Sequence, residues 1–258
     1  MNSIPPWKRP ELFGCPVDAV TLAQAVGWVD DRIAERRPVR VGVVNAAKLV
    51  KIERDPELAR AVTTCELILA DGMSVTWASR MLTGVRLQRV AGIDLMEALV
   101  ARAAERGYRL YFLGAKQEVL DRMLDVFLTR FPHLVVAGSH HGYFKREDEA
   151  SLAETIRATS PDILFVGMGT PAKEYWIDRN YVAAGAVVSR GVGGSFDVHS
   201  GLVRRAPEWM QRLGLEWFYR LLQEPRRLWR RYLTTSSIFL GEVFVRTVRR
   251  PFVRSGKP

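Results

Sequence analysis

Cysteine and long apolar runs are both scarce in this chain of 258 residues. Only Cys15 and Cys65 occur, too few for a disulfide framework and without metal-ligand spacing, so we expect a protein of the reducing cytoplasm. The longest stretch without Asp, Glu, Lys or Arg is residues 131–144, shorter than the roughly 20 apolar residues of a membrane-spanning helix. Residues 1–8 lack the apolar core of a secretion signal. The composition, 48% hydrophobic and 26% charged, excludes wholesale disorder.

Positive charge is concentrated in the last fifth of the chain. Residues 204–258 hold 13 Lys and Arg against 4 Glu, whereas residues 1–203 hold 25 Lys and Arg against 24 Asp and Glu. Twelve of those 13 cations are arginine, whose planar fork of donors suits phosphate. We therefore expect a near-neutral body over residues 1–203 and a basic appendage over residues 204–258. A solvated charged tail is the alternative, although such tails seldom carry so many aromatic residues.

Short apolar runs alternate with helix-like stretches along the body. The runs that read as strands are residues 39–44, 67–70, 109–113, 134–137, 162–166 and 186–189. Helical spacing of apolar residues is found over residues 93–105, 117–131 and 150–158. This alternation predicts an α/β fold with a mainly parallel sheet covered by helices on both faces. Ligands bind such sheets at the carboxyl ends of the strands, so the residues that follow the strands are the candidate site.

Asp71-Gly72 is the strongest candidate for a functional site among these strand ends. A carboxylate after a buried strand, followed by a glycine that lets a ligand approach, suits a general base. Asp-Gly is also a common turn dipeptide, so from spacing alone a turn is the more frequent explanation. His140 and His141 have no partner at metal-ligand spacing, and we expect them in a loop.

Two glycine-rich loops follow later strands, residues 167–171 and residues 191–194. Both are suited to present backbone N–H groups to a phosphate, but neither completes a dinucleotide fingerprint, and a tight turn is at least as common. In the appendage, a helix over residues 226–231 places Arg227, Arg230 and Arg231 on one face. Three guanidinium groups repel one another unless an anion lies between them, and a diphosphate or an acidic membrane surface would supply one.

Together these residues resemble the WecG/TagA/CpsF family of bacterial glycosyltransferases over almost the whole chain. The stretches that carry the resemblance are residues 14–18, 44–46, 70–72, 89–94, 113–114, 141–144, 167–171, 191–197, 204–207, 214–217 and 224–227. The resemblance implies a Rossmann-like body. It also implies a peripheral enzyme on the inner face of the cell membrane that uses no metal or cofactor. Such enzymes move a hexose or N-acetylhexosamine from a UDP-sugar to a polyprenyl-diphosphate-linked sugar, in the synthesis of surface polysaccharide or exopolysaccharide.

The resemblance also implies roles for individual residues. It makes Asp71 the general base, and attack opposite the leaving group would then invert the anomeric centre in one step. The substrate-binding positions that it implies are Asn45, Arg89, Gly169, Pro171, Lys173, Glu174, Gly193, Asp197, Arg220, Arg227 and Arg230. The appendage arginines would stabilise the departing diphosphate in place of a metal ion.

Two positions depart from the family pattern. The chain has Val43 where Thr is usual, and Lys173 where Gln is usual. Losing a hydroxyl and gaining a cation should alter sugar or diphosphate contacts, so the identity of the donor sugar stays open. The acceptor lipid, the linkage and the formation of a homo-oligomer are open as well.

Two other classes of function compete with a glycosyltransferase. A nucleotide-binding oxidoreductase would use the same sheet, but the glycine fingerprint and the acidic residue for the ribose are missing. A nucleic-acid-binding protein would use the basic, aromatic appendage, but it leaves the strand-end residues unexplained. We therefore expect no nucleic acid among the partners.

Overall fold

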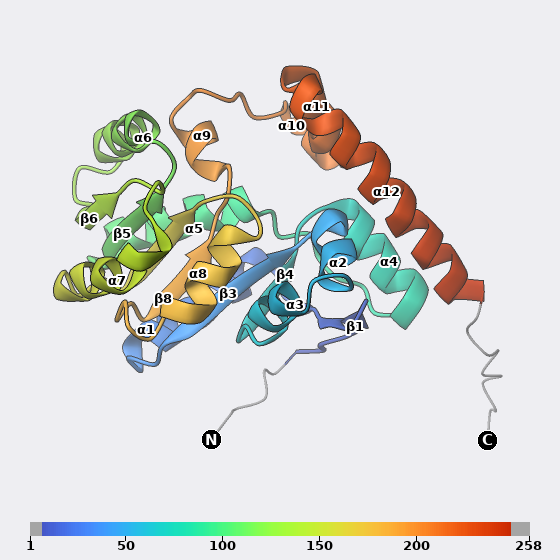
Figure 1. Cartoon of the computed structure of the whole chain (residues 1–258), viewed down its shortest axis with the longest axis horizontal. Coiled ribbons are helices and arrows are strands. Elements are labelled where there is room, and N and C mark those ends of the chain that lie inside the picture. The colour runs from blue at the N-terminus through green and yellow to red at the C-terminus, as the bar shows by residue number, and fades with distance from the viewer. Residues whose placement is uncertain (1–6, 249–258) are drawn as a thin grey trace.

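The computed structural model describes residues 7–248, without the side chains of Arg212, Arg227, Leu228, Arg230, Arg231, Tyr232 and Leu233. Its centre is a six-stranded parallel sheet in the order β4-β3-β8-β7-β5-β6 (Figure 1). The strands are β3 (Val39–Val44), β4 (Leu67–Ala70), β5 (Arg109–Gly114), β6 (Val135–His140), β7 (Ile163–Gly167) and β8 (Val188–Gly191). A short antiparallel pair, β1 (Glu11–Leu12) and β2 (Cys15–Pro16), lies outside this sheet. The predicted Rossmann-like α/β fold is confirmed.

Helices cover both faces of the sheet, because the strands are apolar on both sides. One core cluster joins the sheet to α1 (Leu22–Ala34), α5 (Gly92–Arg106), α6 (Gln117–Arg130) and α9 (Ser195–His199). Two clusters on the other face include α2 (Ala46–Ile52), α3 (Pro56–Thr63), α4 (Met73–Thr83), α7 (Glu149–Ala158) and α8 (Ala172–Asn180). A single turn of 3₁₀ helix, η1 (Arg146–Asp148), precedes α7. This arrangement leaves the carboxyl edge of the sheet to the connecting loops.

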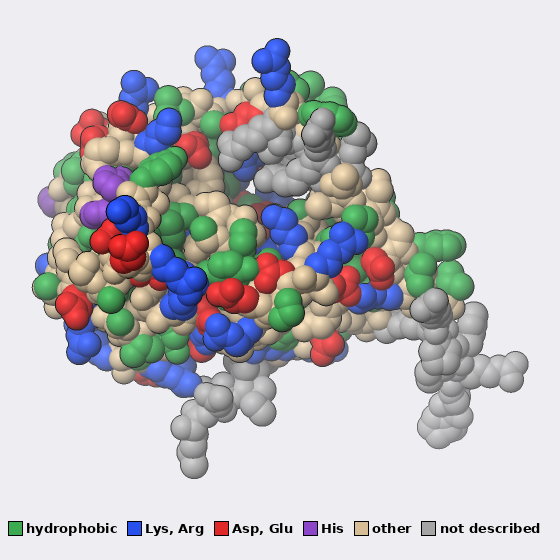
Figure 2. Space-filling view, in the orientation of Figure 1, with side chains coloured by type: hydrophobic (Ala, Val, Ile, Leu, Met, Phe, Trp, Pro, Cys, Tyr) green, Lys and Arg blue, Asp and Glu red, His purple; other side chains and the backbone are tan. Residues whose placement is uncertain are grey.

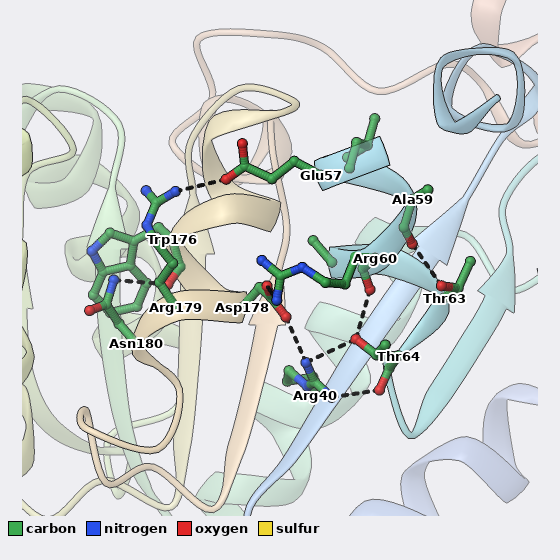
Figure 3. Close-up of polar contacts among 12 residues, drawn as sticks. Arg40, Glu57, Ala59, Arg60, Thr63, Thr64, Trp176, Asp178, Arg179 and Asn180 are labelled. Carbon is green, nitrogen blue, oxygen red and sulfur yellow. Dashed lines mark hydrogen bonds and ion pairs between the residues drawn. The ribbon is translucent and has the colours of Figure 1, made fainter. Parts of the chain in front are cut away.

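A network of charged side chains connects two helices to the sheet near the amino-terminal ends of its strands (Figure 3). Arg40, near the start of β3, donates to the Asp178 carboxylate of α8 at 2.9 Å and to the Thr64 carbonyl at 2.5 Å. Arg60 of α3 pairs with the other Asp178 oxygen at 2.7 Å. The buried Arg40 therefore ties α3 and α8 to the sheet, away from the strand ends that carry Asp71.

The appendage consists of α10 (Glu208–Arg212), α11 (Glu216–Gln223) and α12 (Pro225–Val248). The predicted boundary at residue 203 falls between α9 and α10, and α12 lies along α2 and α4 (Figure 1). Phe239 and Val243 of α12 are buried in a core cluster of the body, and the Phe239 ring stacks on Phe13 at 5.2 Å. Arg246 pairs with Glu53 and lies over the Phe13 ring at 4.3 Å. Independent folding of residues 1–203 stays a prediction.

Candidate active site

Asp71 follows β4 directly and lies between the sheet and the start of α5. Its N–H donates to the Val44 carbonyl at 2.8 Å, and its carboxylate accepts the backbone N–H of Gly92. Gly72 has φ of 102°, a conformation that favours glycine, and α4 begins at the next residue. Burial first, and then the charge of Glu216, raise the pKa of Asp71 above its usual value. A carboxylate with a raised pKa is a stronger proton acceptor than an ordinary aspartate.

Arg89 joins the body to the appendage beside this carboxylate. Its guanidinium pairs with Glu216 of α11 at 2.8 Å and donates to the Gln211 carbonyl at 2.8 Å. Arg205 pairs with Asp94 of α5 and lies 3.6 Å from Glu216. The positive charge of Arg89 lowers the pKa of Asp71 and so opposes Glu216. These contacts place α10 and α11 over the carboxyl edge of the sheet.

Asn45 directly follows β3 and caps α2. Its side-chain oxygen accepts the N–H of Lys48 at 3.0 Å, and the residue is exposed at the carboxyl edge. The cap orients the first turn of α2, from which the buried Lys48 side chain donates to the Val43 carbonyl at 2.6 Å. Asn45 therefore has a structural role in addition to the predicted substrate contact.

Lys173 and Glu174, at the start of α8, form a buried trio with Lys48. Both ammonium groups lie on the same Glu174 oxygen, at 2.8 Å from Lys48 and 2.9 Å from Lys173. Burial and the charge of Lys48 lower the pKa of Lys173 to about 8, and the two lysines hold that of Glu174 at about 2. Lys173 also donates to Thr170, whereas the second Glu174 oxygen is buried and has no hydrogen-bond partner within residues 7–248. The trio carries one net positive charge.

The glycines of the two loops have different local roles. A side chain at Gly167 would lie 2.4 Å from the Phe196 ring, and one at Gly191 would lie 2.9 Å from Lys173. Packing therefore requires glycine at both positions. Gly169 is exposed with open space around it, Pro171 immediately precedes α8, and Gly193 has φ of 53°. These three follow strands of the sheet at its carboxyl edge, and their contact with a substrate stays a prediction.

Arg220 of α11 lies over the second glycine loop. A Cβ at Gly194 would be 2.8 Å from its guanidinium and 3.5 Å from the carboxylate of Asp197 in α9. The buried Nε of Arg220 has no hydrogen-bond partner in the part of the chain that the structure describes. Arg227 and Arg230 belong to the first turns of α12, but their side chains are outside the described part of the structure. The structure thus places Arg220, Asp197 and the glycine loop together.

Three charged residues of this site carried no assigned role in the sequence analysis: Lys48, Glu216 and Arg190. Lys48 follows Asn45 by three residues, which places it in the first turn of α2, and this spacing was a usable signal. Glu216 reaches Arg89 from far along the chain, and no local pattern indicates that pair. Arg190 lies within the central strand β8, and only the three-dimensional structure shows that it is fully buried.

His140 and His141 lie at the end of β6, the edge strand on the opposite side of the sheet from β4 and Asp71. His140 is the last residue of β6 rather than part of a loop, because β6 pairs with β5 as far as this residue. With His141, Tyr143 and Asp148 it lines a cavity of about 320 Å³ beside α7. Within residues 7–248, no cluster of three His, Cys, Asp or Glu side chains is arranged to hold a metal ion.

The chain is similar to proteins of known function. The family model of the WecG/TagA/CpsF glycosyl transferases matches residues 10–252, a range that holds all the residues described above. A similar protein from Bacillus subtilis (strain 168) is N-acetylglucosaminyldiphosphoundecaprenol N-acetyl-beta-D-mannosaminyltransferase. It is 37% identical over 201 residues, which cover 78% of this chain and 77% of the relative. The chain therefore belongs to the WecG/TagA/CpsF family and is a glycosyltransferase.

Proposed function

We propose that the enzyme transfers a hexose or N-acetylhexosamine from a UDP-sugar to a sugar linked to polyprenyl diphosphate, in bacterial surface polysaccharide synthesis. The observation that carries the proposal is the convergence of a buried carboxylate, Asp71, with the basic edge formed by Arg89, Lys48 and Lys173. The B. subtilis relative is named for N-acetylmannosaminyl transfer to N-acetylglucosaminyl-diphospho-undecaprenol, a substrate pair of this class.

Asp71 supplies the base of the proposed reaction. Its carboxylate takes the proton of an acceptor hydroxyl, and the hydroxyl oxygen forms a bond to the anomeric carbon of the donor. The bond between that carbon and the diphosphate oxygen breaks, and its electron pair leaves with UDP. Because the nucleophile enters opposite the leaving group, the anomeric configuration inverts. The raised pKa of Asp71 favours the proton transfer.

Positive charge at the carboxyl edge stabilises the leaving diphosphate. Arg220, with its unpartnered Nε, and the net positive trio of Lys48, Lys173 and Glu174 are the described groups suited to this role. Oriented charges in a site of low dielectric need no reorganisation as the phosphate charge develops. Arg227 and Arg230 complete the set in this proposal, at positions one and two turns into α12.

Substitution of Asp71 tests the proposed base. Asp71→Asn keeps the size of the side chain and removes its basicity, so we expect turnover to fall by about 10²–10⁴ while donor binding is retained. The assay is the release of UDP from UDP-N-acetylhexosamines in the presence of a short polyprenyl-diphosphate N-acetylglucosamine. Asp125→Asn on the exposed face of α6 is the matched control and should keep wild-type turnover. Wild-type turnover in Asp71→Asn would leave Asp71 as a turn residue only.

Membrane association through the appendage is the second part of the proposal. Six apolar side chains of the appendage are between 41% and 63% exposed: Trp209, Leu213, Trp217, Phe218, Leu222 and Trp229. In Figure 2 apolar side chains gather at the upper right, where Figure 1 places α11, with basic side chains beside them. No helix within residues 7–248 is long and apolar enough to cross a membrane. Apolar and cationic side chains on one surface suit the headgroup region of an anionic bilayer.

Cosedimentation with vesicles tests the membrane contact. We expect the full chain to bind phosphatidylglycerol vesicles. The double variant Leu213→Ser with Leu222→Ser should bind at least tenfold more weakly, because burying each leucine side chain in the bilayer contributes about 1.5–3 kcal/mol to the binding free energy. Val126→Ser with Leu128→Ser on α6 is the matched control, because these side chains are also exposed. Equal binding by both double variants would contradict a membrane contact through α10 and α11.

A further inference from the structure

Arg190 is an arginine in the middle of an apolar core. It is fully buried in β8, in register with Val41 of β3 and Phe165 of β7, which belong to the cluster under α1, α5 and α6. Burying a guanidinium costs free energy unless its donors and its charge find partners. Among the described residues its Nε and Nη1 have no hydrogen-bond partner, so hydrogen bonds alone do not account for its presence.

The remaining nitrogen of Arg190 reaches the residue that holds Asp71. Its Nη2 donates to the Gly92 carbonyl at 2.6 Å, while the Gly92 N–H donates to the Asp71 carboxylate. A Cβ built on Gly92 would lie 3.7 Å from Nη2 of Arg190 and 3.8 Å from Oδ2 of Asp71. Gly92 thus stands between a buried cation and the carboxylate, and it is the first residue of α5.

We propose that Arg190 is a positioning residue for Asp71, which fixes the first turn of α5 against the carboxylate and supplies buried positive charge that keeps it ionised. The inference rests on the proposed role of Asp71 as the base. The other groups that act on Asp71 are Glu216 of α11, Arg89, and Lys48 of α2. Glu216 is already paired with Arg89, whereas Arg190 is fully buried and donates to the Gly92 carbonyl beside Asp71. Arg190 is therefore the cation on the core side of the site.

The charges of the two groups act on each other. Burial lowers the pKa of Arg190 to about 9, and the Asp71 carboxylate acts in the opposite direction. At neutral pH the guanidinium stays protonated, so it favours the ionised form of Asp71. Removing the charge should then raise the pKa of Asp71 further and leave less of the base ionised at a given pH.

The pH dependence of kcat/KM distinguishes this role from simple packing. The distances of 3.7 Å and 3.8 Å from the Cβ position of Gly92 place Nη2 of Arg190 no farther than about 7.5 Å from Oδ2 of Asp71. We expect Arg190→Met to move the acidic limb upward by about 0.4–1.6 pH units, the effect of one charge at that distance at effective dielectric constants from 80 to 20. Arg190→Lys, which keeps a cation, should move it less. Arg122→Met on α6 removes an exposed arginine and should leave the limb in place. An equal loss of rate at every pH, with an unshifted limb, would overturn the proposal.

A measurement without substrate covers the case in which Arg190→Met does not fold. Asp71→Asn removes the counter-charge of the guanidinium and also the cost of burying the carboxylate, so the coupling is measured by comparing two backgrounds. A coupled pair predicts that Asp71→Asn lowers the denaturation midpoint more, or raises it less, in the wild type than in Arg190→Lys, whose shorter side chain brings the cation to a different place. Equal midpoint changes in the two backgrounds would overturn the pairing. The readout is independent of turnover: retained activity in Asp71→Asn would refute the proposed base, whereas the difference between the two midpoint changes tests the coupling of Arg190 to Asp71.

Discussion

Replacing one side chain of α12, in the variant Phe239→Ala, tests whether the appendage is part of the core of the body. Phe239 is 2% exposed and packs with its ring 5.2 Å from that of Phe13, at an interplanar angle of 17°. Removing a buried phenylalanine leaves a cavity and typically costs about 3–5 kcal/mol. Net stabilities of proteins are about 5–15 kcal/mol, so this loss is a large fraction of the total.

The measurement is equilibrium unfolding in guanidinium chloride, followed by tryptophan fluorescence and by far-ultraviolet circular dichroism. We expect both signals of Phe239→Ala to shift together to a lower midpoint. Phe244→Ala, on the same helix, removes a ring that is 68% exposed and should change the free energy of unfolding by about 0.5 kcal/mol or less. The comparison isolates the effect of side-chain burial on the free energy of unfolding, because the residue type, the substitution and the helix are the same.

Equal midpoints for the two variants would refute the packing argument, since α12 would then contribute no more through its buried face than through its exposed one. The result also bears on the predicted boundary at residue 203. Deleting residues 204–258 removes Phe239 and Val243 from the cluster that contains Leu12 and Phe13. We therefore expect the remaining body to be less stable than the full chain.

Two further predictions concern charge. Glu216→Gln removes the carboxylate that raises the pKa of Asp71, so the acidic limb of kcat/KM should move to lower pH; an unmoved or higher limb would contradict the electrostatic role of Glu216. Lys173 has a pKa of about 8 in the fold and 10.5 when unfolded, so the unfolded chain binds more protons between these values. The wild type should therefore gain stability relative to Lys173→Gln as the pH rises from 8 to 10, measured as the difference in denaturation midpoint.

The sheet could be predicted from the sequence because its strands are buried on both faces and therefore appear as apolar runs. The last strand was misplaced by two residues, since Ala186 and Val187 look like a strand start whereas β8 runs over Val188–Gly191 and includes Arg190. An arginine inside a central strand contradicts the apolar pattern. Only the surrounding core and Gly92, distant in sequence, explain its place.

The candidate site was predicted where chemistry and topology coincide. Asp71 follows a strand, and parallel strands bring their carboxyl ends to one edge, so its position needed no knowledge of strand order. The pair of Arg89 and Glu216 depends on how the appendage folds back, which local sequence does not encode. Family membership decides among the three classes of function, in favour of the glycosyltransferase over the oxidoreductase and the nucleic-acid-binding protein.

The two departures from the family pattern meet in one cluster. Lys48 donates to the carbonyl of Val43 and pairs with Glu174, and Glu174 also pairs with Lys173. With glutamine at position 173, the charges of Lys48 and Glu174 would cancel, whereas Lys173 leaves one positive charge beside the second glycine loop. A threonine at position 43 would add a hydroxyl next to the same carbonyl. Because the groups share partners, the effects of substitutions at these two positions on stability should not be additive.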